Sequence, residues 1–143
     1  MVIKMKDYIR KVNYYETDKM GVTHNSNYIK WMEEARVYFL EQMGYGYSAL
    51  ERDGIALPVI AVECRYKHSS TFDDEVSIHV TVAEFHGVRL TIDYTMVNIK
   101  TGDVILTGKT THCFVDREGK PIILKKRIPE FDRILKEQTK KCR

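Results

Sequence analysis

The chain has 143 residues, with 23 Lys and Arg against 20 Asp and Glu and a formal net charge of +3. This length predicts one domain with a hydrophobic core of its own. The small positive charge does not favour nucleic acid as a partner, and no apolar run reaches the roughly 18 residues of a membrane span.

The cysteines and histidines argue against disulfides and metal sites. The three cysteines, Cys64, Cys113 and Cys142, are widely spaced and form no Cys-x-x-Cys pair, which favours free thiols in a reducing compartment. No pair of histidines has the spacing of metal ligands, so no metal site is expected. Residues 1–7 lack the apolar core of a signal peptide. We therefore expect a cytoplasmic protein.

The first part of the chain predicts one strand, a turn and one long helix. The helix carries large apolar side chains over most of its circumference, as expected of a buried helix. Short polar residues at 24–27 offer several N-caps, and Gly44 offers a C-terminal stop. The expected elements are a strand over 6–16, a turn over 18–21, a helix over 27–43 and a short helix over 47–52.

The rest of the chain is dominated by strand patterns. Apolar and polar residues alternate with period two from Val76 and again from Val88, the pattern of half-buried strands. The apolar parity shifts at Val97, which predicts a bulge, and Gly108 lies inside a strand as a bend. The expected elements are strands starting at 57, 76, 88 and 104, a hairpin at 86–87, a short strand at 122–124 and a helix over 129–138.

The order of elements predicts an α+β fold. We expect an antiparallel sheet of five or six strands, several of them long, wrapped around one long central helix. Residues 1–143 are expected to form a single domain, with 139–143 as a disordered basic tail.

Three short segments together resemble a known family. Residues 15–22 read Tyr-Glu-Thr-Asp-Lys-Met-Gly-Val, residues 27–28 read Asn-Tyr, and residues 34–36 read Glu-Ala-Arg. This pattern resembles the hot-dog-fold acyl-CoA thioesterases of the 4-hydroxybenzoyl-CoA thioesterase type, over roughly residues 6–135. The resemblance implies an acyl-CoA substrate, a homodimer whose sheets join, often paired into a homotetramer, and no metal or prosthetic group.

The resemblance also assigns roles to single residues. Asp18 falls on the catalytic carboxylate, and Asn25 falls where a main-chain N–H polarises the thioester carbonyl. Candidate substrate-binding residues are Gly21, His24, Tyr28 and Arg89. The chain departs from many relatives at His24 and Asn25, and it has Arg89 alone where some relatives hold coenzyme A with adjacent arginines.

The residues themselves fit this chemistry. There is no Gly-x-Ser-x-Gly pattern, the mark of a nucleophile elbow. A single carboxylate at Asp18 can deprotonate water or attack the carbonyl directly to give a mixed anhydride, and the sequence leaves both routes open. A helix start carries the equivalent of roughly +0.5 charge, which suits a developing oxyanion. Gly21 lets the backbone approach a substrate closely.

Other interpretations compete with this one. Asp18 also fits a turn, His24 a helix cap, Tyr28 a core aromatic and Glu34 a helix-surface charge. The basic residues 125–127 fit either a solvated turn or the rim of a coenzyme A site. At the level of function, the alternatives are a non-catalytic acyl-CoA-binding hot-dog module and a thioesterase acting on acyl carrier protein. A hydratase is disfavoured because the Asp-His pairing of such enzymes has no counterpart, and the acyl group stays open.

Overall fold

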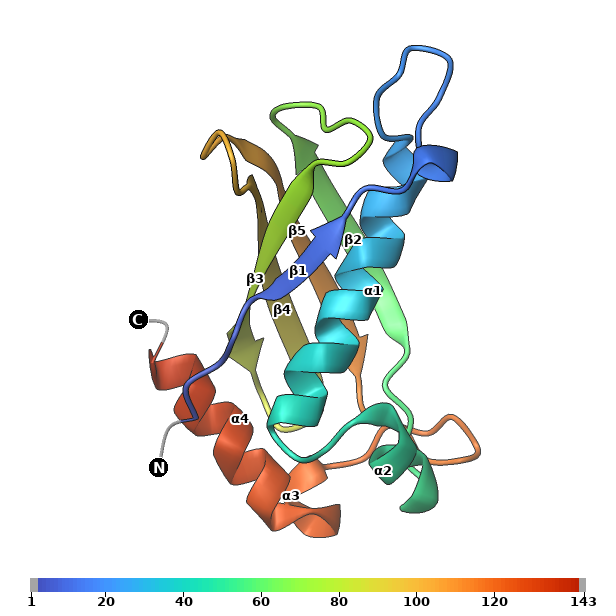
Figure 1. Cartoon of the computed structure of the whole chain (residues 1–143). Helices are drawn as coiled ribbons and strands as arrows, with labels where there is room; N and C mark the ends of the chain where they lie inside the picture. Colours follow the sequence, from blue (N-terminus) through green and yellow to red (C-terminus); the bar gives the residue numbers. More distant parts are fainter. Residues whose placement is uncertain (1–2, 142–143) are drawn as a thin grey trace.

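The computed structural model describes residues 3–141 as one antiparallel sheet with a long helix lying against it (Figure 1). The sheet has five strands in the order β1-β3-β4-β5-β2. The strands are β1 Tyr8–Lys11, β2 Val59–Tyr66, β3 Glu75–Phe85, β4 Arg89–Asn98 and β5 Val104–Cys113. The helices are α1 Asn25–Gln42, α2 Tyr47–Arg52, α3 Leu124–Arg127 and α4 Pro129–Lys141, with a single 3-10 turn, η1, over Tyr14–Glu16. The predicted α+β class is confirmed.

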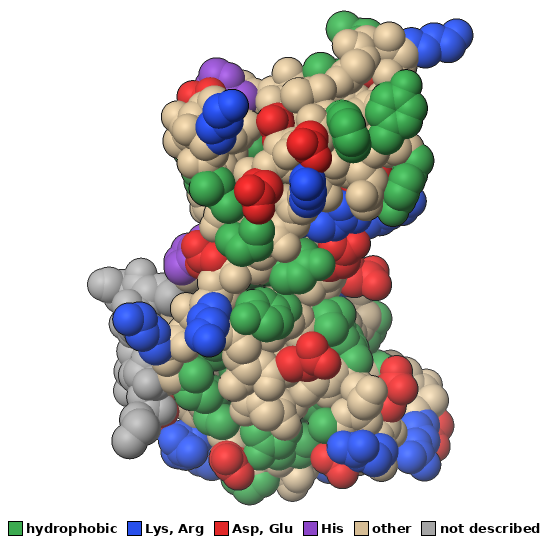
Figure 2. All heavy atoms as spheres, viewed as in Figure 1, with side chains coloured by type: hydrophobic (Ala, Val, Ile, Leu, Met, Phe, Trp, Pro, Cys, Tyr) green, Lys and Arg blue, Asp and Glu red, His purple; other side chains and the backbone are tan. Residues whose placement is uncertain are grey.

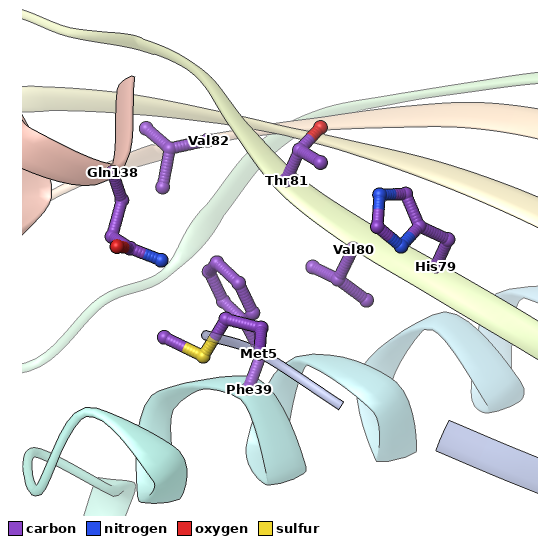
Figure 3. A pocket seen from close by; sticks show the side chains of 7 residues that line it. All are labelled: Met5, Phe39, His79, Val80, Thr81, Val82 and Gln138. Atoms are coloured by element: carbon purple, nitrogen blue, oxygen red, sulfur yellow. The ribbon is translucent and has the colours of Figure 1, made fainter. Parts of the chain in front are cut away.

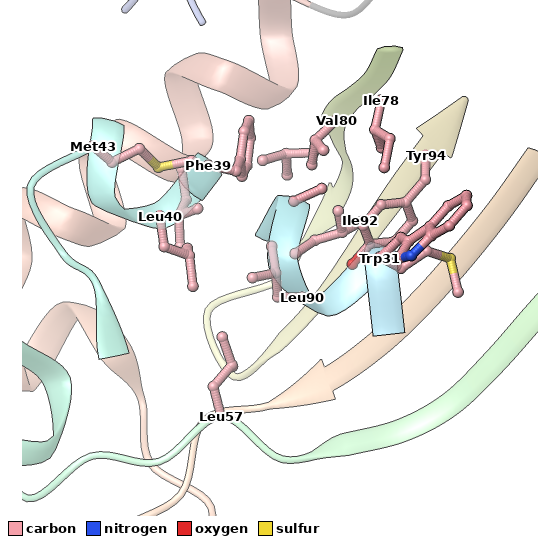
Figure 4. Close-up of a cluster of buried hydrophobic side chains, with 14 of the residues drawn as sticks. Trp31, Phe39, Leu40, Met43, Leu57, Ile78, Val80, Leu90, Ile92 and Tyr94 are labelled. Carbon is pink, nitrogen blue, oxygen red and sulfur yellow. The ribbon is translucent and has the colours of Figure 1, made fainter. Parts of the chain in front are cut away.

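The central helix α1 supplies the core of the molecule. Its large side chains Trp31, Met32 and Leu40 are fully buried. Figure 4 shows Trp31 and Leu40 among apolar side chains from β3 and β4, which include Ile78 and Ile92. Burying side chains of this size stabilises the fold by roughly 1.5–3 kcal/mol each, so the helix and the sheet hold each other in place.

Strands β3, β4 and β5 are joined by tight turns, as their period-two patterns predicted. Gly87 takes a φ of +81° between β3 and β4, a conformation that costs glycine little. The predicted bulge is confirmed, because the register of β4 against β5 shifts between Met96 and Val97. Gly108 has a different role from the predicted bend. A Cβ built there would lie 2.7 Å from Met32 Sδ, so glycine lets the helix approach β5.

Three sequence predictions at element boundaries were wrong. The first strand ends at Lys11, because the chain turns into η1 and buries Glu16. Residues 122–124 form no strand. Pro121 makes one isolated bridge to Val115, and the buried Leu124 starts α3 with its amide donating to the carbonyl of Gly87. Residues 139–141, predicted as tail, continue α4, and residues 142–143 lie outside the described part.

Strand β2 forms one edge of the sheet and is open to solvent. It pairs only with β5 in the described chain, and its side chains Val59, Ile60, Val62 and Tyr66 are 43–53% exposed. No helix in the described residues is long and apolar enough to cross a membrane.

Candidate functional site

Asp18 sits at the base of a small hairpin over residues 17–23. Its amide donates to the carbonyl of Val22 at 2.9 Å, and its carbonyl accepts from the amide of Gly21 at 2.9 Å. Gly21 has a φ of +78°, which explains the glycine at this position. Asp18 Oδ1 accepts from the amide of Met20 at 2.8 Å. The side chain is exposed, so its second oxygen remains open to a ligand.

Both ends of this hairpin meet on the carbonyl of Glu16. That oxygen accepts from the amide of His24 at 2.8 Å and from Nδ2 of the buried Asn27 at 2.9 Å. The contact explains why Asn27 belongs to the sequence pattern. It closes the loop that carries Asp18 onto the first turn of α1.

The side chain of Glu16 is buried and fully bonded. Its carboxylate accepts a two-pronged contact from Arg10 at 2.8 and 2.7 Å, the amide of Asn13 at 2.8 Å and the indole Nε1 of Trp31 at 3.0 Å. Burial raises the pKa of Glu16, but the hydrogen bonds from Arg10, Asn13 and Trp31 outweigh it and lower the pKa below its ordinary value. The charged carboxylate therefore ties the loop to the helix.

Arg10 links this carboxylate to a second one. Its Nε donates to Glu34 Oε1 at 2.9 Å, and the hydroxyl of Tyr8 donates to the same oxygen at 3.0 Å. Its guanidinium lies 5.2 Å from the ring centre of Trp31. Glu34 is therefore a partner of Arg10 as well as a helix-surface charge. Sequence reasoning missed this network, although Glu16 lies inside the recognised pattern.

A second set of contacts holds the far side of the hairpin. The amide of Thr23 donates to the carbonyl of Ser70 at 2.8 Å, and Ser70 Oγ lies 2.8 Å from the hydroxyl of Tyr28. Thr71 Oγ1 donates to the carbonyl of Gly21 at 2.8 Å. Tyr28 is buried and its ring contacts Tyr66 at the end of β2. The structure therefore places Tyr28 as an anchor of the site.

The first amides of α1 differ in their availability. His24 is the N-cap, and its Nδ1 accepts from the amide of Ser26 at 3.2 Å. The amide of His24 itself is taken by Glu16. None of the hydrogen bonds found in residues 3–141 uses the amide of Asn25. This N–H stands at the positive end of the helix dipole, where an oxyanion is best stabilised.

Two hollows flank this helix start. The larger has a volume of about 910 Å³ and its lining includes Asp18 and His24. The smaller, about 250 Å³, is lined in part by Asn25 and Tyr28 and reaches Tyr66 at the sheet edge. Within one chain the candidate base and the candidate oxyanion donor thus line different hollows. Gly21 shapes the hairpin and lines neither hollow.

Arg89 lies away from the Asp18 hairpin. It opens β4 next to the turn at Gly87, whereas the Asp18 hairpin contacts Thr71, which precedes β3. These are opposite ends of strands of about ten residues at roughly 3.3 Å per residue. One chain therefore does not bring Arg89 to the other candidate residues.

The hollows found elsewhere in the described residues are lined by none of the candidate site residues. A cavity of about 290 Å³ between α1 and β3 is lined by Met5, Phe39, Val80 and Val82, with Gln138 and His79 at its rim (Figure 3). In residues 3–141 no group of three His, Cys, Asp or Glu side chains is arranged to hold a metal ion.

A buried polar cluster also lies under α1. Arg36 donates to the hydroxyls of Tyr47 at 2.8 Å and Tyr94 at 3.0 Å. Thr110 Oγ1 links Tyr94 to His112 Nε2 at 2.7 and 2.8 Å. Burial, with the nearby Arg36 charge, lowers the pKa of His112 to about 4. The imidazole is therefore neutral near pH 7, and the cluster joins α1, α2, β4 and β5.

Comparison with known proteins gives one consistent result. Residues 12–139 match the family model described as the Thioesterase-like superfamily. The chain is 30% identical over 122 residues to the Bacillus subtilis protein named "Putative acyl-CoA thioesterase YneP", covering 85% of this chain and 88% of that protein. It is 32% identical over 123 residues to an Aquifex aeolicus protein named "Putative esterase", covering 86% and 94%.

Solved structures agree with the sequence comparison. The DHNA-CoA thioesterase of Staphylococcus aureus superposes with a TM-score of 0.87 at 29% identity, covering 92% of this chain and 89% of that one. The gentisyl-coenzyme A thioesterase BH1999 superposes with a TM-score of 0.75 at 27% identity, covering 86% and 100%. The predicted hot-dog fold is thereby confirmed.

The Glu16 network predicts that the two carboxylates that bind Arg10 contribute differently to the free energy of unfolding. Glu16→Gln should lower the free energy of unfolding by about 3 kcal/mol, because it breaks a buried ion pair. Glu34→Gln, at the more exposed carboxylate, should cost about 1 kcal/mol or less. Denaturant unfolding at pH 7 measures both. Equal losses would contradict a special role for the buried carboxylate.

The same network predicts a pH dependence. The pKa of Glu16 is lowered in the fold, so its contribution is fully present above the ordinary pKa of 4.5 and is lost as pH falls through the folded pKa. The gap in unfolding free energy between parent and Glu16→Gln should therefore narrow from pH 7 to pH 3. A gap that stays constant over this range would contradict the assignment.

Proposed function

This chain belongs to the thioesterase-like superfamily and is a thioester hydrolase, and we propose that its substrate is an acyl-CoA. The observation that carries the proposal is that an exposed carboxylate, Asp18, and an amide unused within the described chain, that of Asn25, line two hollows flanking the start of one helix. Relatives whose names specify coenzyme A thioesters support the coenzyme A half of the substrate.

Asp18 supplies the reacting carboxylate in this proposal. One oxygen accepts from the amide of Met20, and we assign the other oxygen to the reaction. As a base it takes a proton from water while the water oxygen attacks the thioester carbon. As a nucleophile it forms a mixed anhydride, the thiolate of coenzyme A leaves, and water then cleaves the anhydride. Both routes yield the free acid and coenzyme A.

The amide of Asn25 supplies the charge stabilisation. The carbonyl oxygen becomes negative in the tetrahedral state, and a fixed N–H at a helix start stabilises it without rearrangement. The neighbouring amides of His24 and Ser26 are taken by Glu16 and by the His24 ring, which favours Asn25. We propose that carboxylate, water and amide suffice, with no metal or prosthetic group.

We propose a homodimer as the working unit, with a homotetramer as its further assembly. Strand β2 offers an open edge with exposed apolar side chains, and such edges pair readily with another chain. The smaller hollow reaches Tyr66 on this strand, so a second copy at β2 would border the hollow that contains Asn25.

Relatives specify several acyl groups. The Staphylococcus aureus and BH1999 enzymes are named for aromatic acyl-CoA substrates, so aromatic acyl groups are the first to test in a thiol-release assay over a panel of acyl-CoA thioesters. We also place the protein in the cytoplasm. Its cysteines Cys64 and Cys113 are free thiols, which fits a reducing compartment.

Asp18→Asn should lower kcat by roughly 10²-fold or more, the scale of losing a positioned base. The amide oxygen of asparagine can still accept from Met20, so the hairpin should persist and the circular dichroism spectrum should not change. Asp116→Asn is the control, because Asp116 also accepts backbone amides in a turn. Turnover of Asp18→Asn within threefold of the parent would remove Asp18 from the mechanism.

Replacing Asn25 separates its side chain from its main chain. Asn25 is the first helical residue, a position where proline is favoured, and His24 before it has the extended ψ of 137° that proline requires. Asn25→Pro should fold yet lose ~10²- to 10³-fold in rate with the donor gone. Asn25→Ala should lose under about tenfold. Equal losses would assign the role to the side chain.

Light scattering at micromolar concentration should give the mass of at least a dimer. Val62→Lys in the middle of β2 should shift the mass toward the monomer and lower activity, because a charge opposes edge pairing. Ile99→Lys replaces an equally exposed apolar residue outside β2 and should change neither property. A parent that is monomeric, or an active monomeric Val62→Lys, would contradict an interface site.

A further inference from the structure

The larger hollow beside Asp18 carries more than the reacting carboxylate. Lys19 stands on the hairpin, Lys30 on α1, and the rings of Tyr14 and Tyr15 belong to η1. We infer that these four side chains bind the nucleotide end of the coenzyme, with the lysines on its phosphates and a tyrosine ring on its adenine. This inference rests on the proposed acyl-CoA hydrolysis and names a site for the half of the substrate that Arg89 cannot reach in the same chain.

The two lysines have no ion-pair partner in the part of the chain that the structure describes. Lys11, Lys109 and Lys136 each have an acidic partner at 2.8–3.9 Å. No ion pair found in the described chain uses Lys19 or Lys30, and both side chains are exposed at the hollow. Two ammonium groups that line one hollow and have no ion-pair partner among the described residues suit a ligand with several negative charges, and phosphates are common lysine ligands.

The tyrosines suit a flat aromatic ligand. Tyr14 is 75% exposed and Tyr15 is 81% exposed, so both rings are open to solvent beside the hollow. Both are held in place: Tyr14 packs edge-on against Phe72, and the hydroxyl of Tyr15 accepts from Asn13 Nδ2 at 3.0 Å. Stacking of a base on an aromatic ring needs such a fixed, open face. Figure 2 shows hydrophobic side chains open to solvent in the upper part of the molecule.

The combination of charge and rings selects coenzyme A over an acyl carrier protein. Both substrates present a phosphopantetheine arm, and the lysines suit the phosphate of either. Only coenzyme A adds an adenine and further phosphates, which match the two rings and the second lysine. A truncated thioester such as the N-acetylcysteamine ester lacks the whole nucleotide end and keeps the reacting carbonyl.

The test compares KM for these substrates in a double variant. Lys19→Ala/Lys30→Ala should raise KM for acyl-CoA by about tenfold, since each exposed charge contact contributes about 0.7 kcal/mol. The value of kcat should stay within threefold, and kcat/KM for the N-acetylcysteamine thioester should not change. Calorimetry with coenzyme A alone should show a Kd raised by the same factor. Tyr15→Ala should raise KM for acyl-CoA and leave the truncated ester unaffected.

The matched control removes the same charge at the other end of the chain. Lys125→Ala/Lys126→Ala alters two exposed lysines on α3 and should leave KM and Kd unchanged. A rise in KM with this control, and none with Lys19→Ala/Lys30→Ala, would place the nucleotide at α3 and overturn the inference.

The remaining outcomes are also decisive. Equal losses on acyl-CoA and on the truncated ester would show that the lysines act on the reaction, which overturns a nucleotide site. An effect of Tyr15→Ala on acyl carrier protein thioesters as large as on acyl-CoA would overturn the adenine contact. A parent that hydrolyses neither acyl-CoA nor the truncated ester would instead refute the proposed function.

Discussion

The buried ion pair between Arg10 and Glu16 is the contact on which the site depends. It joins β1 to the residue at which both ends of the Asp18 hairpin meet, and Trp31 adds a bond from the middle of α1. Burying two charges is costly unless every lone pair is used, and here the carboxylate has four donors. The sheet, the helix and the Asp18 hairpin are therefore fixed to one another at a single point.

In this arrangement one carboxylate orders the loop and a different carboxylate is exposed to solvent. The carboxylate that orders the loop is buried, and the carboxylate assigned to the reaction is exposed two residues later. A preorganised group loses little entropy when a substrate binds. The polar pair of Ser70 and Tyr28 holds the other side of the hairpin, so Asp18 projects from a frame that is bonded on both sides. The pattern Glu-x-Asp in the sequence thus combines one structural carboxylate with the carboxylate proposed to react.

Sequence reasoning found the elements whose patterns are local. The period-two strands, the parity shift at Val97 and the apolar helix all followed from the spacing of side chains along the chain. Sequence reasoning failed where a contact between distant residues determines the start or the end of an element. The first strand stops early because Glu16 turns inward to Arg10 and Trp31, and Leu124 starts a helix because its amide meets Gly87 across the molecule. Spacing along the chain does not reveal such pairs.

In the candidate site, too, the sequence pattern identified one residue, and distant contacts had to come from the structure. The pattern led to Asp18, but only the structure distinguishes three adjacent amides and leaves that of Asn25 unused. It also shows that the hollow at Asn25 borders the open edge strand, while the hollow at Asp18 is lined by free lysines. An acyl-CoA is a long molecule with an apolar end and an anionic end. In the proposed binding mode, a substrate that lies across the helix start meets the hollow at the open sheet edge at one end and a basic, aromatic hollow at the other, with its thioester between them.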